Sequence, residues 1–138
     1  MSSLDLYAID ANVILRYVLG KKQPFYQQAE EIFQAIKHGQ IDVYLDPVVL
    51  GEVVWVLTSF YERSPESIAE GLLPIIGLDH LHLAGKDRYI SSLMHYADIR
   101  HFGDTCLCEL ALEECEGRVL SFDRKIDKVP DIQRYESL

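Results

Sequence analysis

The stretch LDLYAIDANVILRYVLG, residues 4–20, predicts how the fold begins. Its first part, LDLYAI, is an apolar run without clean alternation, as expected of a strand that is covered on both faces. Residues 12–19 then have the pattern of a helix that ends at Gly20. A strand that leads directly into a helix is typical of an α/β protein, and Asp10 lies at the junction.

The same alternation continues along the chain. Asp46 and Ser64 each precede a proline, which is the order expected of an N-cap and a first helical residue. Pro74 is expected to end or kink the helix that starts at Ser64, and the tail after Asp127 is less regular. The patterns predict strands at residues 41–45, 80–84 and 118–122, and helices at residues 25–36, 47–61, 86–97 and 104–116.

Strands that alternate with helices imply a parallel sheet with helices on both faces, so we predict a three-layer α/β/α fold with a central parallel sheet. The 138 residues suit one domain with its own core, and we expect residues 1–138 to form it. Sites in such folds lie beyond the carboxyl ends of the strands, where Asp10 and Asp123 fall. The order of the strands does not follow from periodicity.

The composition, 49% hydrophobic and 25% charged, is that of an ordinary globular protein. No apolar run reaches the roughly 20 residues that span a bilayer, and the N-terminus lacks the basic start of a secretion signal. We therefore expect a cytoplasmic protein without a membrane partner. With 13 basic and 22 acidic residues the net charge is −9, so a nucleic-acid substrate would need metal ions or a local cluster of cations.

Cysteine and histidine give weaker signals. The odd number of cysteines, in one segment, argues against a disulfide framework and against a Cys-rich zinc site. Cys108 and Cys115 share a predicted helical stripe, so we expect them to be small buried hydrophobic residues. His80 and His82 alternate along a predicted strand without an evident third ligand, which favours a polar strand face over a metal site.

Four acidic residues are candidates for a shared site. Asp10 and Asp123 follow predicted strands, and Glu52 and Asp104 lie in apolar helical stretches. Carboxylates are costly to bury in such settings unless something positive neutralises them. Brought together, they would hold Mg²⁺ or Mn²⁺, because these hard cations prefer oxygen ligands.

Each of the four also has an ordinary structural explanation. Asp10, or Asn12 after it, would cap the following helix. Glu52 would lie exposed on a wide helical face, and Asp104 would complement a helix dipole. Asp123 would occupy a surface turn. The coincidence of all four with such positions favours a common function.

Four segments of the chain carry a family resemblance: YAIDANVILRYVLG, VVLGEVVWVL, HFGDTCLCELAL and VLSFDRKIDKV. With these segments the chain resembles the PIN-domain nucleases, especially the VapC-type toxins of toxin–antitoxin pairs. Their order and spacing extend the resemblance over nearly the whole chain. Similar proteins commonly carry Ala-Asp-Ala-Leu where this chain has Gly103-Asp104-Thr105-Cys106, a departure that keeps the acid and bears only on local packing.

The resemblance implies a role for individual residues. Asp10, Asp104 and Asp123 would hold Mg²⁺ or Mn²⁺, and Glu52 would complete the ligand shell directly or through a water. Asp127 is expected to be a solvated turn residue rather than an accessory acid. The remaining candidates are Asn12 and Ser121 as accessory polar groups, and Arg16, Arg124 and Lys125 as phosphate contacts.

The implied activity is that of a metal-dependent endoribonuclease in which water attacks phosphorus and leaves a 5′-phosphate and a 3′-hydroxyl. The expected partners are an RNA substrate, a cognate antitoxin protein and a second copy of the chain as a homodimer.

A catalytically inactive PIN-fold module that binds RNA or protein is the main alternative. A dehalogenase-type phosphatase also begins with a strand and Asp-x-Asp, but Asn12 stands at its second acid and cannot exchange a proton. A receiver domain offers Asp46 as a phospho-acceptor, but it needs adjacent acids where this chain has Ala8-Ile9-Asp10.

Overall fold

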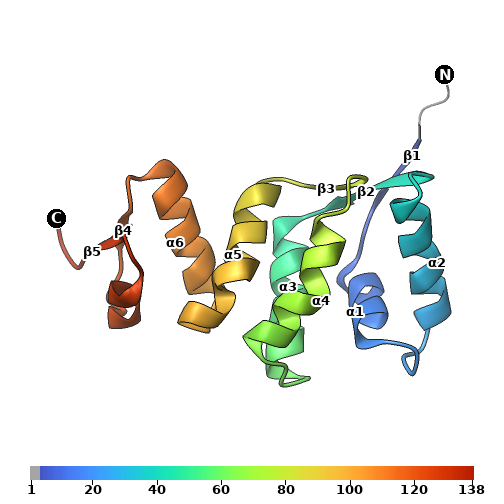
Figure 1. The fold of residues 1–138 in the computed structure, drawn as a ribbon, viewed down its shortest axis with the longest axis horizontal. Helices are drawn as coiled ribbons and strands as arrows, with labels where there is room; N and C mark the ends of the chain where they lie inside the picture. Colours follow the sequence, from blue (N-terminus) through green and yellow to red (C-terminus); the bar gives the residue numbers. More distant parts are fainter. Residues whose placement is uncertain (1–3) are drawn as a thin grey trace. The chain divides into compact units, whose positions relative to one another are not determined.

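The computed structural model describes residues 4–138, and the chain divides into two compact units (Figure 1). Unit 1 is Met1–Lys86, described from Leu4 onward, and unit 2 is Asp87–Leu138. Each unit contains helices and a parallel sheet of its own. The single domain expected over residues 1–138 stays a prediction.

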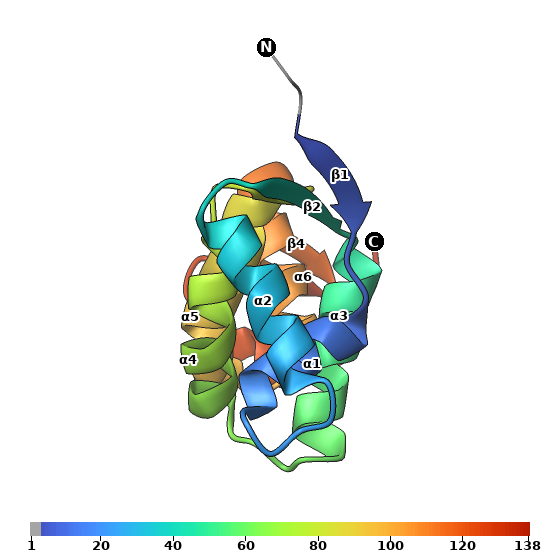
Figure 2. The ribbon, with the colours of Figure 1, turned by 90° about the vertical axis from the view of Figure 1, so that its right-hand side faces the viewer.

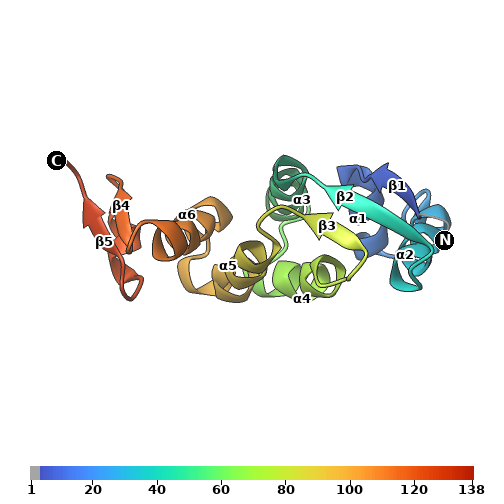
Figure 3. The same ribbon diagram turned by 90° about the horizontal axis from the view of Figure 1, so that it is seen from above.

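The sheet of unit 1 has three parallel strands in the order β1-β2-β3, which lie side by side in Figure 3. The strands are β1 (Asp5–Ala8), β2 (Ile41–Leu45) and β3 (Leu81–Leu83). Tyr7 pairs with Val43, and Val43 pairs with Leu81. Because parallel strands end at the same edge, this register places the carboxyl end of β1, and Asp10 beyond it, at the edge where sites in α/β folds are built.

Four helices of unit 1 lie on one side of this sheet (Figures 1 and 2). They are α1 (Ala11–Leu19), α2 (Tyr26–Lys37), α3 (Pro47–Ser59) and α4 (Pro65–Ile76). The fully buried side chains of unit 1 come from these helices and from β2 and β3; the largest are Phe33, Ile14, Ile36, Leu50, Leu57, Ile68, Leu72, Ile76, Leu81 and Val43. The core therefore fixes α1 and α3 beneath the sheet.

The first strand differs from its prediction. All four residues of β1 are exposed, including Leu6 and Tyr7. The expectation of a strand covered on both faces is therefore wrong within unit 1. Within unit 1, β1 pairs with a strand on one side only and the helices lie on one face of the sheet (Figures 1 and 2), so its side chains are left open.

The helix starts follow the sequence closely. Asp46 Oδ1 accepts a hydrogen bond from the Val48 N–H (2.8 Å), and Ser64 Oγ accepts one from the Ser67 N–H (3.1 Å), so both predicted N-caps are confirmed. Pro74 lies inside α4, which continues to Ile76. A proline so near the end of a helix removes only one of the last intrahelical hydrogen bonds.

Unit 2 builds a second, smaller core. Its elements are α5 (Lys86–Ile99, of which Lys86 falls in unit 1), α6 (Phe102–Glu114), β4 (Arg118–Leu120), the 3₁₀ helix η1 (Arg124–Lys128) and β5 (Gln133–Tyr135). β4 and β5 pair in parallel. A cluster of Cys108, Ala111, Val119 and Ile126 joins α6, β4 and η1. The regular structure of η1 and β5 was not predicted from the sequence.

The cysteines only partly follow their expected pattern. All three are free, and Cys108 is buried as expected. Cys115 is exposed, because α6 ends at Glu114 and the helical stripe ends with it. Burial raises the pKa of the Cys106 and Cys108 thiols, which disfavours their reactive thiolate forms.

Within residues 4–138, none of the helices has both the length and the apolar character needed to cross a bilayer.

Candidate metal and RNA site

Asp10 lies where β1 gives way to α1. Its backbone is extended (φ −87°, ψ 154°), and its Oδ1 accepts a hydrogen bond from the Ala11 N–H (2.7 Å). Asp10 is therefore the N-cap of α1, as the ordinary structural explanation expected. A carboxylate has two acceptor oxygens, so capping leaves further capacity for a ligand.

Asp10 and Glu52 lie at one hollow of about 230 Å³. Asp10 comes from the start of α1 and Glu52 from the middle of α3, and the two helices pack against each other. Asn12 and Arg16 line the same hollow, together with Ala11, Leu15, Leu19, Val56, Phe60 and Tyr61. Four of the residues selected from the sequence therefore gather at one place in unit 1.

The two acids of the hollow are exposed rather than buried. The expectation that the carboxylates lie buried in apolar surroundings is therefore wrong for Asp10 and Glu52. The apolar neighbours of Glu52 in the sequence, such as Val53 and Val54, point into the core, while Glu52 lies on the opposite side of α3. This follows from the helical period, in which successive residues face different directions.

The chemistry of the hollow fits a hard cation. Its oxygen donors include the carboxylates of Asp10 and Glu52 and the side-chain amide of Asn12, and neither Cys nor His is among its lining residues. Oxygen donors of this kind suit Mg²⁺ or Mn²⁺. Within residues 4–138, no group of three or more Asp, Glu, His or Cys side chains is arranged to hold a metal ion. Asp10 and Glu52 would therefore need further donors to bind one.

One cation is held at the edge of the hollow. The guanidinium of Arg16 donates from Nη1 to Oε1 of Gln23 (2.8 Å). This hydrogen bond restrains the half-buried Arg16 side chain on α1, one turn after Asn12. Arg16 is thus placed beside two carboxylates and can offer its remaining N–H groups to a phosphate.

Asp104 lies in the first turn of α6 in unit 2 and is half-buried. The helix starts at Phe102 rather than at Asp104, and His101 is its N-cap. When its ring is neutral, His101 accepts a hydrogen bond at Nδ1 from the Asp104 N–H (3.1 Å). The same nitrogen lies 3.3 Å from the Asp104 Oδ2, with which a protonated ring would form an ion pair. The sequence did not reveal this cap, because His is not among the residues that commonly start helices.

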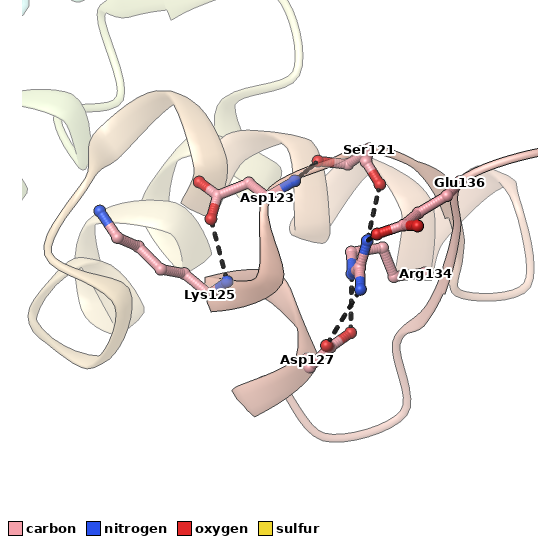
Figure 4. A network of polar contacts seen from close by, with 6 residues as sticks. All are labelled: Ser121, Asp123, Lys125, Asp127, Arg134 and Glu136. Atoms are coloured by element: carbon pink, nitrogen blue, oxygen red, sulfur yellow. Dashed lines mark hydrogen bonds and ion pairs between the residues drawn. The ribbon is translucent and has the colours of Figure 1, made fainter.

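Asp123 is the N-cap of η1 and follows the end of β4 by three residues. Its Oδ1 accepts from the Lys125 N–H (2.9 Å), and its own N–H donates to Ser121 Oγ (3.0 Å), as Figure 4 shows. Ser121, expected beside the last acid, therefore supports the backbone of Asp123. Arg124 and Lys125 are exposed in η1, and their role as phosphate contacts stays a prediction.

Arg134 is the residue that sequence reasoning missed. From β5 its guanidinium donates to both carboxylate oxygens of Asp127 (2.8 and 3.2 Å), to Oε1 of Glu136 (2.8 Å) and to the Ser121 carbonyl (3.0 Å) (Figure 4). These bonds lower the pKa of Asp127 and raise that of Arg134. Asp127 is exposed, as expected, but it lies in the 3₁₀ helix η1 and is also the ion-pair partner of Arg134, which β5 brings to it.

A second polar cluster joins Asp42 on β2 to His82 on β3 and to His80, the residue just before β3. Asp42 Oδ1 is 2.7 Å from Nε2 of His82 and 3.1 Å from Nδ1 of His80. Two hydrogen bonds lower the pKa of the Asp42 carboxyl. The bond with His82 has the larger effect, and the bond with His80 has the smaller one. The expected polar strand face is present. The part played by Asp42 was not predicted, because Asp42 lies on the neighbouring strand β2.

Together these features define an α/β protein with parallel strands, an oxygen-donor hollow in unit 1 and two further acids at element starts in unit 2. The roles of Asp10, Glu52, Asp104 and Asp123 as catalytic residues, and their meeting at one ion, stay predictions.

The model of the PIN domain family matches residues 7–125, which is most of the chain. The chain therefore belongs to the PIN domain family. The match, together with the helices and parallel strands, confirms the predicted fold class and is consistent with three α/β/α layers. PIN domains are generally nucleases and typically use divalent metals.

The matched segment contains all four acids and ends before Asp127, Arg134 and Glu136. No curated protein shows significant sequence similarity to the chain.

Proposed function

We propose that the chain is a metal-dependent endoribonuclease that hydrolyses RNA phosphodiester bonds, and that it serves as the toxin of a type II toxin–antitoxin pair. One observation carries the proposal: in a member of a nuclease family, Asp10 and Glu52 lie at one hollow with a restrained Arg16. Acidic oxygens next to a cation suit a divalent ion and the phosphate that it binds.

The proposed ligands of the ion are Asp10, Asp104 and Asp123, with Glu52 bound directly or through a water. When bound, Mg²⁺ or Mn²⁺ lowers the pKa of a coordinated water and provides the hydroxide nucleophile at neutral pH. The carboxylates would supply charge and orientation. Ser121 Oγ accepts from the Asp123 N–H, and Asn12 is the proposed polar neighbour of Asp10 in the hollow. Water attacks phosphorus and the bond to the 3′ oxygen breaks, so the products carry a 5′-phosphate and a 3′-hydroxyl.

The phosphate contacts proposed are Arg16, Arg124 and Lys125. A chain of net charge −9 repels RNA at long range, so attraction must be local. Arg16 is the best supported of the three, since Gln23 holds its guanidinium at the hollow. The bound ion would offset the negative charge of the acids and so reduce their repulsion of RNA.

The proposal includes partners and a place in the cell. A toxin of this kind would be cytoplasmic and would form a homodimer. It would be held inactive by a cognate antitoxin protein whose segment lies across the acidic hollow. A small open reading frame for a DNA-binding antitoxin immediately upstream would support the toxin role, whereas a processing enzyme would need no such neighbour.

A matched pair of variants tests the catalytic role. Asp10→Asn and Asp46→Asn each replace an exposed N-cap by Asn, which caps helices equally well. Both should therefore melt near the wild-type temperature. We expect Mn²⁺-dependent cleavage of labelled single-stranded RNA to be lost in Asp10→Asn and retained in Asp46→Asn.

Equal cleavage by the two variants would refute the role of Asp10. Binding of RNA by the wild-type protein without cleavage under any divalent ion would favour the inactive binding module instead.

A further inference from the structure

Two aromatic side chains project at the end of α3. Phe60 is 75% exposed and Tyr61 is 36% exposed. Their ring centroids are 4.9 Å apart with an edge-to-face angle of 71°, an arrangement that aromatic pairs prefer. Single exposed hydrophobic residues are common on protein surfaces, but this pair lines the same hollow as Asp10, Glu52 and Arg16.

The backbone beneath the pair is fixed by hydrogen bonds. The N–H groups of Phe60 and Tyr61 both donate to the Val56 carbonyl (3.0 and 3.2 Å), and the Arg63 N–H returns to the Leu57 carbonyl (2.9 Å). Glu62 provides the left-handed residue of this turn (φ 52°). The rings are therefore carried by the closing turn of a helix, so a ligand would meet a surface that needs little ordering.

The chemistry around the pair matches one kind of ligand. An unpaired nucleobase offers a flat face to an aromatic ring, and its phosphate offers negative charge to Arg16 and to an ion held by the acids. Bases inside a duplex are already stacked and cannot lie on Phe60. The acidic and cationic groups of the hollow, Asp10, Glu52 and Arg16, are better matched to this ligand than to an apolar peptide.

We propose that Phe60, with Tyr61 against its edge, is a stacking subsite for an unpaired base of single-stranded RNA next to the bond that is cut. The subsite deepens the proposed ribonuclease function and rests on it. It gives the enzyme a preference for unpaired RNA and, because every base has a stacking face, little preference among bases at that position.

The test uses Mn²⁺-dependent cleavage of a single-stranded oligoribonucleotide by the full chain. Phe60→Ala should raise the half-saturating RNA concentration about tenfold, equivalent to about 1.4 kcal/mol, with little change in the maximal rate. Phe60→Leu keeps apolar area but loses the ring and should behave like Phe60→Ala. Phe60→Trp should retain wild-type affinity.

Phe25→Ala is the matched control. Phe25 is 70% exposed in unit 1, and it is not among the residues that line the hollow of Asp10, so its removal should leave RNA affinity unchanged. Since both phenylalanines are exposed, Phe60→Ala and Phe25→Ala should melt within a few degrees of the wild type.

Abasic RNA provides a second, independent measurement. One abasic nucleotide, moved along the oligoribonucleotide, should weaken wild-type binding about tenfold at a single position relative to the cut. The Phe60→Ala variant should bind the abasic RNA as tightly as the intact RNA, because this variant has already lost the stacking ring.

The outcomes separate the subsite from the function. If the wild type cleaves RNA but Phe60→Ala and Phe60→Leu retain its affinity, the subsite is refuted and the ribonuclease stands. If these variants instead lose only the binding of a co-expressed antitoxin, the pair belongs to a protein interface and the subsite is likewise refuted. If the wild type cleaves no RNA, the proposed function is refuted, and the subsite with it.

Discussion

Arg134 holds the turn that carries Asp123. One planar guanidinium reaches the Ser121 carbonyl, Asp127 and Glu136, and Ser121 Oγ in turn accepts from the Asp123 N–H. Bidentate pairing of Arg with a carboxylate fixes geometry as well as charge, and Lys cannot reproduce it. We infer that Arg134 acts on Asp123 through the turn and not by contact with a ligand.

Loss of Arg134 should therefore weaken unit 2 more than loss of a surface ion pair. Arg134→Ala leaves Asp127 and the Ser121 carbonyl without their donor and should lower the melting temperature by several degrees, and Arg134→Lys should restore only part of it. The control is Arg118→Ala, which removes an exposed pair with Glu116 and should change the melting temperature little. Equal effects of Arg134→Ala and Arg118→Ala would contradict the anchoring role.

Asp42 should give the fold a pH-dependent contribution. His82 and His80 lower its pKa in the folded state, below the unfolded value of about 3.9. The fold therefore favours the charged carboxylate. The resulting stability is complete above the unfolded pKa and disappears as the pH falls through the folded pKa.

Urea denaturation at pH 7 and at steps down to pH 3 measures this contribution. Asp42→Asn should be less stable than the wild type at pH 7, and the difference should shrink below about pH 3.9. Asp79→Asn, at an exposed carboxylate nearby, should show no such trend. A constant deficit of Asp42→Asn at every pH would assign the loss to packing instead.

At the scale of single elements, local chemistry made several boundaries predictable. The Asp46-Pro47 and Ser64-Pro65 pairs gave the starts of α3 and α4, because a side-chain acceptor and a preset φ determine a helix start locally. The start of α6 could not be found in this way, since His101 is an unusual cap. The strand β5 could not be predicted, because its three residues form a strand only by pairing with β4.

The cap of α4 provides a quantitative check on an element. Ser64→Ala removes the acceptor for the Ser67 N–H and should cost about 1 kcal/mol in the free energy of unfolding, whereas Ser64→Asp should be nearly neutral. Urea denaturation of both variants measures the difference. Equal stability of Ser64→Ala and the wild type would show that water replaces the cap without loss.

At the scale of the whole molecule, alternating strands and helices predicted the fold class, which the family match confirms. The candidate site was predictable in part. Helical spacing indicated that Arg16 lies near Asn12, whereas the approach of Glu52 to Asp10 depends on the packing of α1 against α3, which no local pattern encodes. The Arg134 network was not predictable, because it requires β4, η1 and β5 to be placed together.

The central proposal is that Asp10 and Asp104 bind the same divalent ion. Calorimetric titration of Mn²⁺ into the wild type, Asp10→Asn, Asp104→Asn and the control Asp46→Asn tests it most directly. We predict that Asp10→Asn and Asp104→Asn each weaken a single class of site at least tenfold and abolish RNA cleavage. Asp104→Asn should melt at or above the wild-type temperature without metal, because carboxylate repulsion is relieved. Unchanged Mn²⁺ affinity in either variant, or separate sites that each respond to only one of them, would contradict the claim.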